Sequence, residues 1–104
     1  MFIARWTIEA KFGHKEQAVG ICKRWDAEVG QRLGLKFNKR VLTGSIGAPE
    51  SRLEFETHAS SLAELEKNWA EMAKMPAHEQ FSKDLEPHIV SGSNSWQIFR
   101  VVEV

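Results

Sequence analysis

The chain has 104 residues and carries 14 basic and 14 acidic side chains, so its formal net charge at neutral pH is zero. This length suits a single domain over residues 1–104 with one ordinary hydrophobic core. Because charges of the two signs are interspersed along the sequence, the composition favours neither a nucleic-acid partner nor a polybasic membrane patch. Cys22 is the only cysteine, which excludes an internal disulfide and fits a cytoplasmic protein.

Residues 2–10 are predicted to form a strand. Apolar residues occupy the even positions, while Arg5, Thr7 and Glu9 alternate with them, as in a strand with one buried face. Because Arg5 and Glu9 carry charges, this segment is expected to be neither a signal peptide nor a membrane span.

A helix is predicted from His14 to about Leu33. Its apolar residues recur at helical spacing, and Gly34 directly after them suits a left-handed cap. The residues of this apolar face are Ala18, Cys22, Trp25, Val29 and Leu33. Two β-like runs follow, at 36–46 and 52–58, and the Gly, Pro and Ser between them suit a hairpin loop. These runs are predicted to pair as antiparallel strands.

A second helix is predicted to begin at Ser61, because Ser61 and Glu64 form a capping box ahead of an apolar stripe. Pro76 interrupts this helix, so the segment is expected to kink there or to restart with Pro76 in its first turn. Pro87 ends the helical region. Residues 96–104 are predicted to form a last strand, since they are rich in β-branched and aromatic side chains.

The element order βαββαβ predicts an α+β fold of the ferredoxin-like type, with two helices on one face of a four-stranded antiparallel sheet. The last strand is apolar on both faces, so the open face of the sheet is expected to meet a second copy of the chain. In this homodimer Phe99 or Val101 would lie at the interface, or Trp96 and Ile98 if the strand has the opposite phase.

The chain resembles the dimeric α/β barrel superfamily, and within it the small proteins grouped with antibiotic biosynthesis monooxygenases and NIPSNAP proteins. The opening strand followed by KFGHKEQAVGICKRW is similar to that family's strand, glycine turn and first helix, and AHEQFSKDLEPHI is similar to its helix with an Ala-His pair. The resemblance implies a dimer in which two ferredoxin-like protomers form a barrel, with a pocket between helices and sheet in each. Members include cofactor-free oxygenases of phenolic substrates, haem-degrading enzymes and isomerases, so the fold alone does not define the function.

The haem-degrading members of the family use an Asn, a Trp and a His. Trp69 and His78 look like the last two, but Arg5, Trp6 and Thr7 stand where the Asn would be expected. We therefore predict no haem site. No metal and no other cofactor is predicted either, because the sequence has no HExxH motif, no cysteine pair and no chelating histidine spacing.

His78 is the candidate catalytic residue. It lies near a predicted helix N-terminus, where the helix dipole disfavours the charged imidazolium, so a neutral ring able to accept a proton is expected. Trp69, Phe81, Trp6 and Trp25 are the candidate substrate-binding residues around it. For the aromatic residues the alternative is a packed core role, and for His78 it is a partly buried ring bonded to a neighbour.

A second candidate is the row formed by Glu54, Glu56 and His58, whose side chains project from one strand face. The row either supplies a site or forms a charged face that pairs with arginines. The arginine expected to complete such a face is Arg5, Arg52 or Arg100.

Two classes of function remain. In the first, the protein is a small cofactor-independent monooxygenase or isomerase of an aromatic or polyketide-like molecule, with His78 as the base. In the second, it is a dimer that binds a small aromatic ligand without chemistry or is purely structural. A cavity of about 300 Å³ or more with His78 in its wall would favour a site over a packed interior.

Overall fold

The computed structural model describes residues 1–35 and 40–104. The elements of these residues are β1 (Phe2–Glu9), α1 (Lys15–Trp25), η1 (Asp26–Gly30), β2 (Arg40–Thr43), β3 (Arg52–Ala59), α2 (Leu62–Ala73), α3 (Pro76–Leu85), η2 (Glu86–His88) and β4 (Ser95–Arg100). The predicted strand at 36–46 contains β2, and its first part, 36–39, lies outside the described residues.

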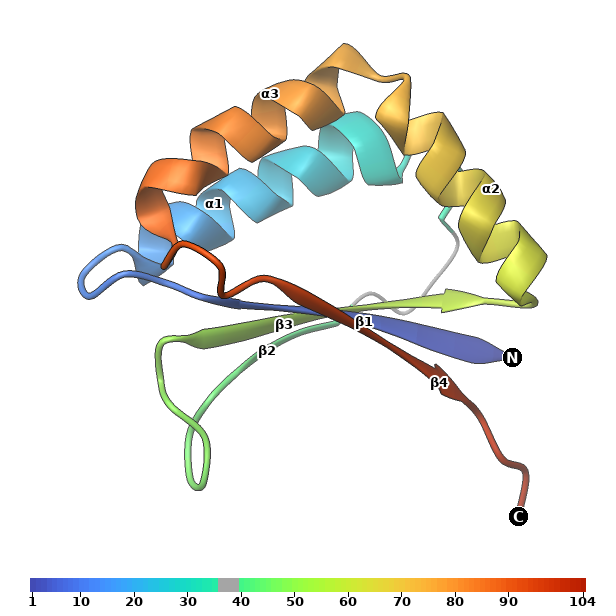
Figure 1. The fold of residues 1–104 in the computed structure, drawn as a ribbon, viewed down its shortest axis with the longest axis horizontal. Coiled ribbons are helices and arrows are strands. Elements are labelled where there is room, and N and C mark those ends of the chain that lie inside the picture. Colours follow the sequence, from blue (N-terminus) through green and yellow to red (C-terminus); the bar gives the residue numbers. More distant parts are fainter. Residues whose placement is uncertain (36–39) are drawn as a thin grey trace.

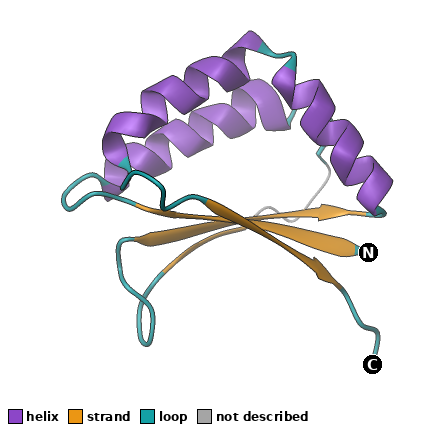
Figure 2. Ribbon diagram, viewed as in Figure 1, coloured by secondary structure: helices purple, strands orange, loops and turns teal. Residues whose placement is uncertain are grey.

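The strands form one antiparallel sheet in the order β2-β3-β1-β4. Figure 1 shows the helices together on one face of this sheet, and Figure 2 shows the same two layers with helices in purple and strands in orange. The predicted ferredoxin-like fold is confirmed, with three α-helices in the described residues where two were expected. Within the same residues, no helix has the length and apolar character needed to cross a membrane.

The core lies between the even residues of β1 and the helices. Ile8 pairs across the sheet with Leu53 of β3, and both are almost fully buried beneath the helix layer. Ala18 and Cys22 of α1 belong to the same cluster. Because full burial of one Ile or Leu side chain is worth about 1.5–3 kcal/mol, this cluster holds the helices on the sheet.

The first helix departs from the prediction after Trp25. The next turn, η1, is a π-helix, in which the backbone amide of Gln31 donates to the carbonyl of Asp26, five residues earlier (2.9 Å). The helical segment therefore ends at Gly30, earlier than expected. Gly34 has a φ of 62°, which is the left-handed conformation predicted for the cap.

Pro76 breaks the second helix as expected. α2 ends at Ala73, Met75 is extended (φ −92°, ψ 120°), and α3 begins with Pro76 in its first turn. Proline lacks the N–H that a helix interior needs, whereas the first helical position leaves that N–H without an intrahelical partner. The chain therefore restarts in a new direction, and α2 and α3 form an arch over the sheet (Figure 1).

The N-terminus of α2 is capped partly as predicted. The Ser61 hydroxyl accepts a hydrogen bond from the backbone amide of Glu64 (3.1 Å). The Glu64 carboxylate, however, accepts from the backbone amide of Ser60 (2.6 Å) and from the Ser60 hydroxyl, and not from Ser61. The Glu64 side chain therefore holds Ser60, which lies between the end of β3 and the N-cap residue Ser61.

β4 presents Trp96 and Ile98 on the helix side of the sheet and Phe99 on the open side. Trp96 lies opposite Trp6 in the register, with ring centres 6.3 Å apart. On the open face, the Arg5 guanidinium lies over Phe99, with its central carbon 5.4 Å from the ring centre. This phase leaves Phe99, and not Trp96, accessible to a partner on the open face.

β4 ends at Arg100, so the predicted strand over 96–104 was too long. Arg100 pairs with Phe2, where β1 begins. The amide of Val101 still donates to the Met1 carbonyl (2.9 Å). The residues after Val101 extend past the start of β1, so β1 has no residues opposite them.

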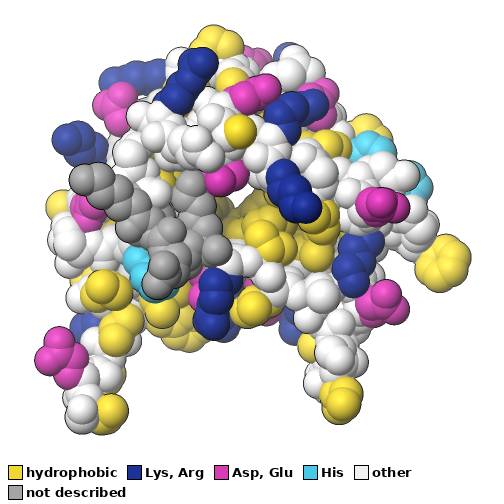
Figure 3. Space-filling view, turned by 180° about the vertical axis from the view of Figure 1, so that it is seen from behind, with side chains coloured by type: hydrophobic (Ala, Val, Ile, Leu, Met, Phe, Trp, Pro, Cys, Tyr) yellow, Lys and Arg dark blue, Asp and Glu magenta, His cyan; other side chains and the backbone are white. Residues whose placement is uncertain are grey.

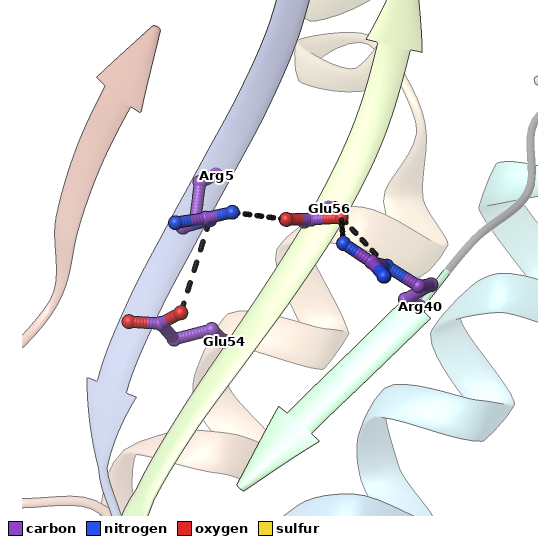
Figure 4. A network of polar contacts seen from close by, with 4 residues as sticks. All are labelled: Arg5, Arg40, Glu54 and Glu56. Atoms are coloured by element: carbon purple, nitrogen blue, oxygen red, sulfur yellow. Dashed lines mark hydrogen bonds and ion pairs between the residues drawn. The ribbon is translucent and has the colours of Figure 1, made fainter. Parts of the chain in front are cut away.

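A carboxylate is buried on the open face of the sheet. Glu56 is only 1% exposed, and its two oxygens accept hydrogen bonds from Arg5 on β1 and from Arg40 on β2, the latter at 2.9 Å from Nε. Glu54 lies 3.8 Å from the same Arg5 (Figure 4). The hydrogen bond from Arg5 lowers the pKa of the Glu56 carboxyl; burial opposes this effect and Arg40 adds to it.

Arg5, one of the three alternatives given by the sequence, completes this charged face as predicted. Arg52 instead approaches Glu9 (3.7 Å), and Arg100 lies opposite Phe2, in the phase of the helix side. Arg40, which was not expected at this face from the sequence, supplies the second guanidinium.

We predict that Glu56→Gln lowers the free energy of unfolding by about 1–3 kcal/mol at pH 7, because two guanidinium groups lose a charged acceptor. The folded-state pKa of Glu56 is lowered below 4.5. Its contribution is therefore present above pH 4.5 and is lost as the pH falls through the folded value. Urea denaturation at fixed protein concentration, at pH 7 and at about pH 3, measures both effects.

Glu50→Gln is the matched control, since the Glu50 side chain is 88% exposed and its ion pair with Lys15 is long at 3.8 Å. We expect that variant to match the wild type at both pH values. Equal stability of Glu56→Gln and wild type at pH 7 would contradict the role given to the buried carboxylate.

Candidate functional site

A cavity of about 910 Å³ lies between the helices and the sheet. Each strand of the described sheet and each of α1, α2 and α3 contributes side chains to its wall. Figure 3 shows a hollow with a hydrophobic floor between the helix layer and the sheet, on the side turned away from the viewer in Figure 1. The interior is therefore not packed solid, and the cavity exceeds the 300 Å³ at which a site becomes the favoured interpretation.

Aromatic residues form a large part of the cavity wall, beside charged and polar residues such as Arg40, Glu56 and His58. The predicted substrate-binding residues all lie in it, together with two aromatic residues not assigned to a site from the sequence. The aromatic residues of the wall are Trp6, Trp25, Phe55, Trp69, Phe81 and Trp96. The alternation of β3 and β4 was the signal that could have added Phe55 and Trp96, since both share the helix-side phase of Trp6.

The rings of this wall contact one another from the sheet to the helices. The ring centre of Trp6 lies 5.6 Å from Phe55, 6.1 Å from Phe81 and 6.3 Å from Trp96. Trp69 reaches Trp96 from α2, at 5.2 Å. These separations are typical of favourable aromatic pairs, so the aromatic residues of the wall form one connected cluster.

His78 enters the wall from the first turn of α3. The indole N–H of Trp25 donates to His78 Nδ1 at 3.0 Å. The imidazole also stacks on Phe81, with ring centres 6.1 Å apart and planes inclined by 27°. The two alternatives considered for His78 are thus both present, because the ring lines a cavity and is also hydrogen-bonded to a neighbour.

The surroundings of His78 favour its neutral form. Burial lowers the pKa of the ring below the ordinary value of 6.5, because a charged imidazolium loses hydration there. Cys22 lies in the same wall, and burial raises the pKa of its thiol to about 12. Cys22 is therefore a neutral thiol at neutral pH and unsuited to act as a nucleophile.

Two other histidines meet away from this cavity. His14 Nδ1 and His88 Nδ1 are 2.9 Å apart while the ring centres are 5.2 Å apart, so the two nitrogens face each other and one donates to the other. The amide of Lys11 donates to the His88 carbonyl and brings the two segments together. Among residues 1–35 and 40–104, no group of three or more His, Cys, Asp or Glu side chains is placed to hold a metal ion.

We predict that His78 titrates below pH 6.5. Since the unfolded chain binds this proton more readily than the folded chain, the free energy of unfolding falls as the pH decreases through 6.5 towards the folded pKa. Nuclear magnetic resonance titration of the ring gives the pKa directly. Urea denaturation of the wild type and His78→Gln between pH 7.5 and 5 gives the linked stability, and we expect a smaller loss in the variant. A ring titrating at or above 6.5 would contradict the burial described here.

No protein-family model and no curated protein matches this chain. Solved structures match it over almost its whole length. A protein from Agrobacterium tumefaciens has 18% sequence identity and a TM-score of 0.81, over 98% of this chain and 94% of that one. A NIPSNAP family protein from strain C58 of the same organism has 16% identity and a TM-score of 0.81, over 98% and 93% of the two chains.

An antibiotic biosynthesis monooxygenase-like protein from Caulobacter crescentus CB15 has 12% identity and a TM-score of 0.73, over 98% of this chain and 90% of that one. At these identities the likeness concerns the fold. The predicted resemblance is thus confirmed at that level: the chain has the ferredoxin-like fold of the NIPSNAP and antibiotic biosynthesis monooxygenase-like proteins.

Proposed function

We propose that this protein binds a small, largely apolar aromatic molecule in the cavity between its helices and its sheet. The proposal is based on the wall itself, in which six aromatic residues and His78 are part of the lining of a cavity of about 910 Å³. Sites for small molecules commonly have volumes of about 300–1,000 Å³ and apolar walls with a few placed polar groups.

A purely structural role accounts less well for this cavity. Protein interiors are packed to crystal density, with few voids larger than a water molecule. Aromatic side chains that served packing alone would fill the space with neighbouring atoms, since a void forfeits the dispersion contacts of its lining. The arrangement of Trp6, Trp69 and Trp96 around an open volume therefore supports a binding role.

A second candidate function is a cofactor-independent monooxygenase or isomerase acting on an aromatic or polyketide-like molecule, with His78 as the base. The fold shared with an antibiotic biosynthesis monooxygenase-like protein supports it. Against it, Nδ1 of His78 already accepts the indole proton of Trp25, so the ring must leave that bond before this nitrogen takes a substrate proton. We therefore place binding first. If the wild type takes up oxygen or converts a bound phenol, and His78→Ala abolishes this activity, catalysis would become the favoured function.

We also propose that the protein is a homodimer formed through the open face of the sheet. The helices cover the other face only (Figure 1), and Phe99 and Val101 remain 45% and 41% exposed in the single chain. β2 and β4 are the edge strands, and a twofold partner would protect such edges.

We expect the wild type to bind naphthalene, used as an apolar aromatic probe, and Trp69→Ala to bind it several-fold to about tenfold more weakly, since one aromatic contact is worth about 0.5–1.5 kcal/mol. Quenching of tryptophan fluorescence, checked by calorimetry, measures the affinity. Leu62→Ala is the control, because Leu62 lies on the same helix, is 55% exposed and is absent from the cavity wall. No binding by the wild type, or equal binding by Trp69→Ala, would count against the site.

The dimer is tested with Phe99→Glu, which places a charge on the open face. Light scattering at micromolar concentration should give twice the chain mass for the wild type and the single chain mass for the variant. Phe12→Glu is the control, since Phe12 is fully exposed in the turn between β1 and α1 and should leave the dimer intact. A monomeric wild type would refute this assembly.

A further inference from the structure

We infer that Trp25 holds His78 as a hydrogen-bond donor to the cavity, and that the site therefore takes aromatic ligands with an acceptor oxygen, such as an aryl ketone. This inference rests on the proposed binding function and names its ligand class. Trp25 is then a positioning residue, which acts on the ligand through the ring of His78.

The donor role follows from the hydrogen bond between the two rings. An indole N–H can only donate, so at 3.0 Å from Trp25 Nε1 the Nδ1 atom of His78 is the acceptor. A neutral imidazole carries one proton on its two nitrogens. Because Nδ1 is occupied as an acceptor, the proton of the neutral ring lies on Nε2.

The Nε2–H group has no partner among the described residues. Within residues 1–35 and 40–104, the His78 side chain makes one hydrogen bond, from Trp25, and ring contacts with Trp25 and Phe81. An N–H group in a largely apolar wall is costly to leave unpaired once water is displaced. A ligand oxygen that accepts from Nε2 removes this cost, whereas a ligand group that only donates does not.

The geometry of the neighbours makes the donor rigid. Trp25 belongs to α1 and His78 to α3, and Phe81, one turn after His78, stacks on the imidazole and also lies 5.9 Å from Trp25. The ring is thus held at one nitrogen and on one face. Such support from two helices fixes the direction of a hydrogen bond.

The first test reads the tautomer without any ligand. In ¹⁵N nuclear magnetic resonance spectra at about pH 8, we expect His78 to show a protonated Nε2 and an unprotonated Nδ1. Trp25→Phe keeps an aromatic ring but removes the donor, so the spectrum should shift towards a mixture of the two tautomers. A wild-type ring protonated at Nδ1 would overturn the inference.

The second test compares two probes of similar shape: naphthalene, and 1-tetralone, which adds a ketone acceptor. We expect the wild type to prefer 1-tetralone over naphthalene about tenfold more strongly than His78→Leu does. His78→Gln, whose amide N–H can reach the position of Nε2–H, should keep most of the preference. Trp25→Phe should lose a large part of this preference, measured as the ratio of the two affinities within that variant.

The outcomes separate the two proposals. If neither probe binds, the cavity proposal fails and the ligand class fails with it, while the spectra still decide the tautomer. If naphthalene binds but the preference for 1-tetralone is the same in the wild type and His78→Leu, the cavity is a site and the donor role of His78 is refuted. A preference lost in His78→Leu and kept in His78→Gln supports the inference.

Discussion

The break in the helical layer at Pro76 determines where the candidate site lies. A continuous helix from Leu62 to Leu85 would run along one line, whereas the extended Met75 turns the chain and lets α3 begin afresh. The restart places His78 in the first turn of α3, where Trp25 of α1 can donate to it. The arch of α2 and α3 lies over the sheet (Figure 1). Aromatic side chains line the cavity beneath it but do not fill it. Because Pro76 has no N–H to donate within a helix, it breaks the helix. Both the cavity beneath the arch and the Trp25–His78 hydrogen bond in its wall depend on this break.

The two faces of the sheet serve different purposes because alternate residues of each strand point to opposite sides. On the helix side, Trp6 and its neighbours on β3 and β4 form the aromatic wall. On the open side, Glu56 is buried between Arg5 and Arg40, and Arg5 also covers Phe99. A buried ion pair of this kind is not a strong source of stability compared with apolar packing, but breaking it is costly. The ion pair of Glu56 with Arg5 and Arg40 therefore fixes which strands lie side by side. The helix face, in contrast, provides a shaped apolar surface.

The fold could be predicted because its signals are local. The alternation in residues 2–10, the position of Gly34 and the break at Pro76 each follow from the chemistry of a few neighbouring residues. The site could be predicted only in part, since its polar contacts join distant segments. His78 and Trp25 are separated by 53 residues, and His14 and His88 by 74, so no spacing rule links them. Arg40 lies in a basic stretch in which nothing marks it as the partner of Glu56. The wider turn after Trp25 was also missed, because apolar periodicity does not distinguish a π turn from an α turn.

We propose that the space between helices and sheet is a binding site with His78 as its donor. The most direct measurement is a crystal structure of the protein with a molecule that copurifies with it, or grown with 1-tetralone. We expect a ligand among Trp6, Trp69 and Phe81, with its oxygen at hydrogen-bond distance from His78 Nε2 and with the Trp25 bond to Nδ1 retained. A cavity closed by repacked side chains, or a ligand bound with His78 turned away from it, would contradict the proposed site.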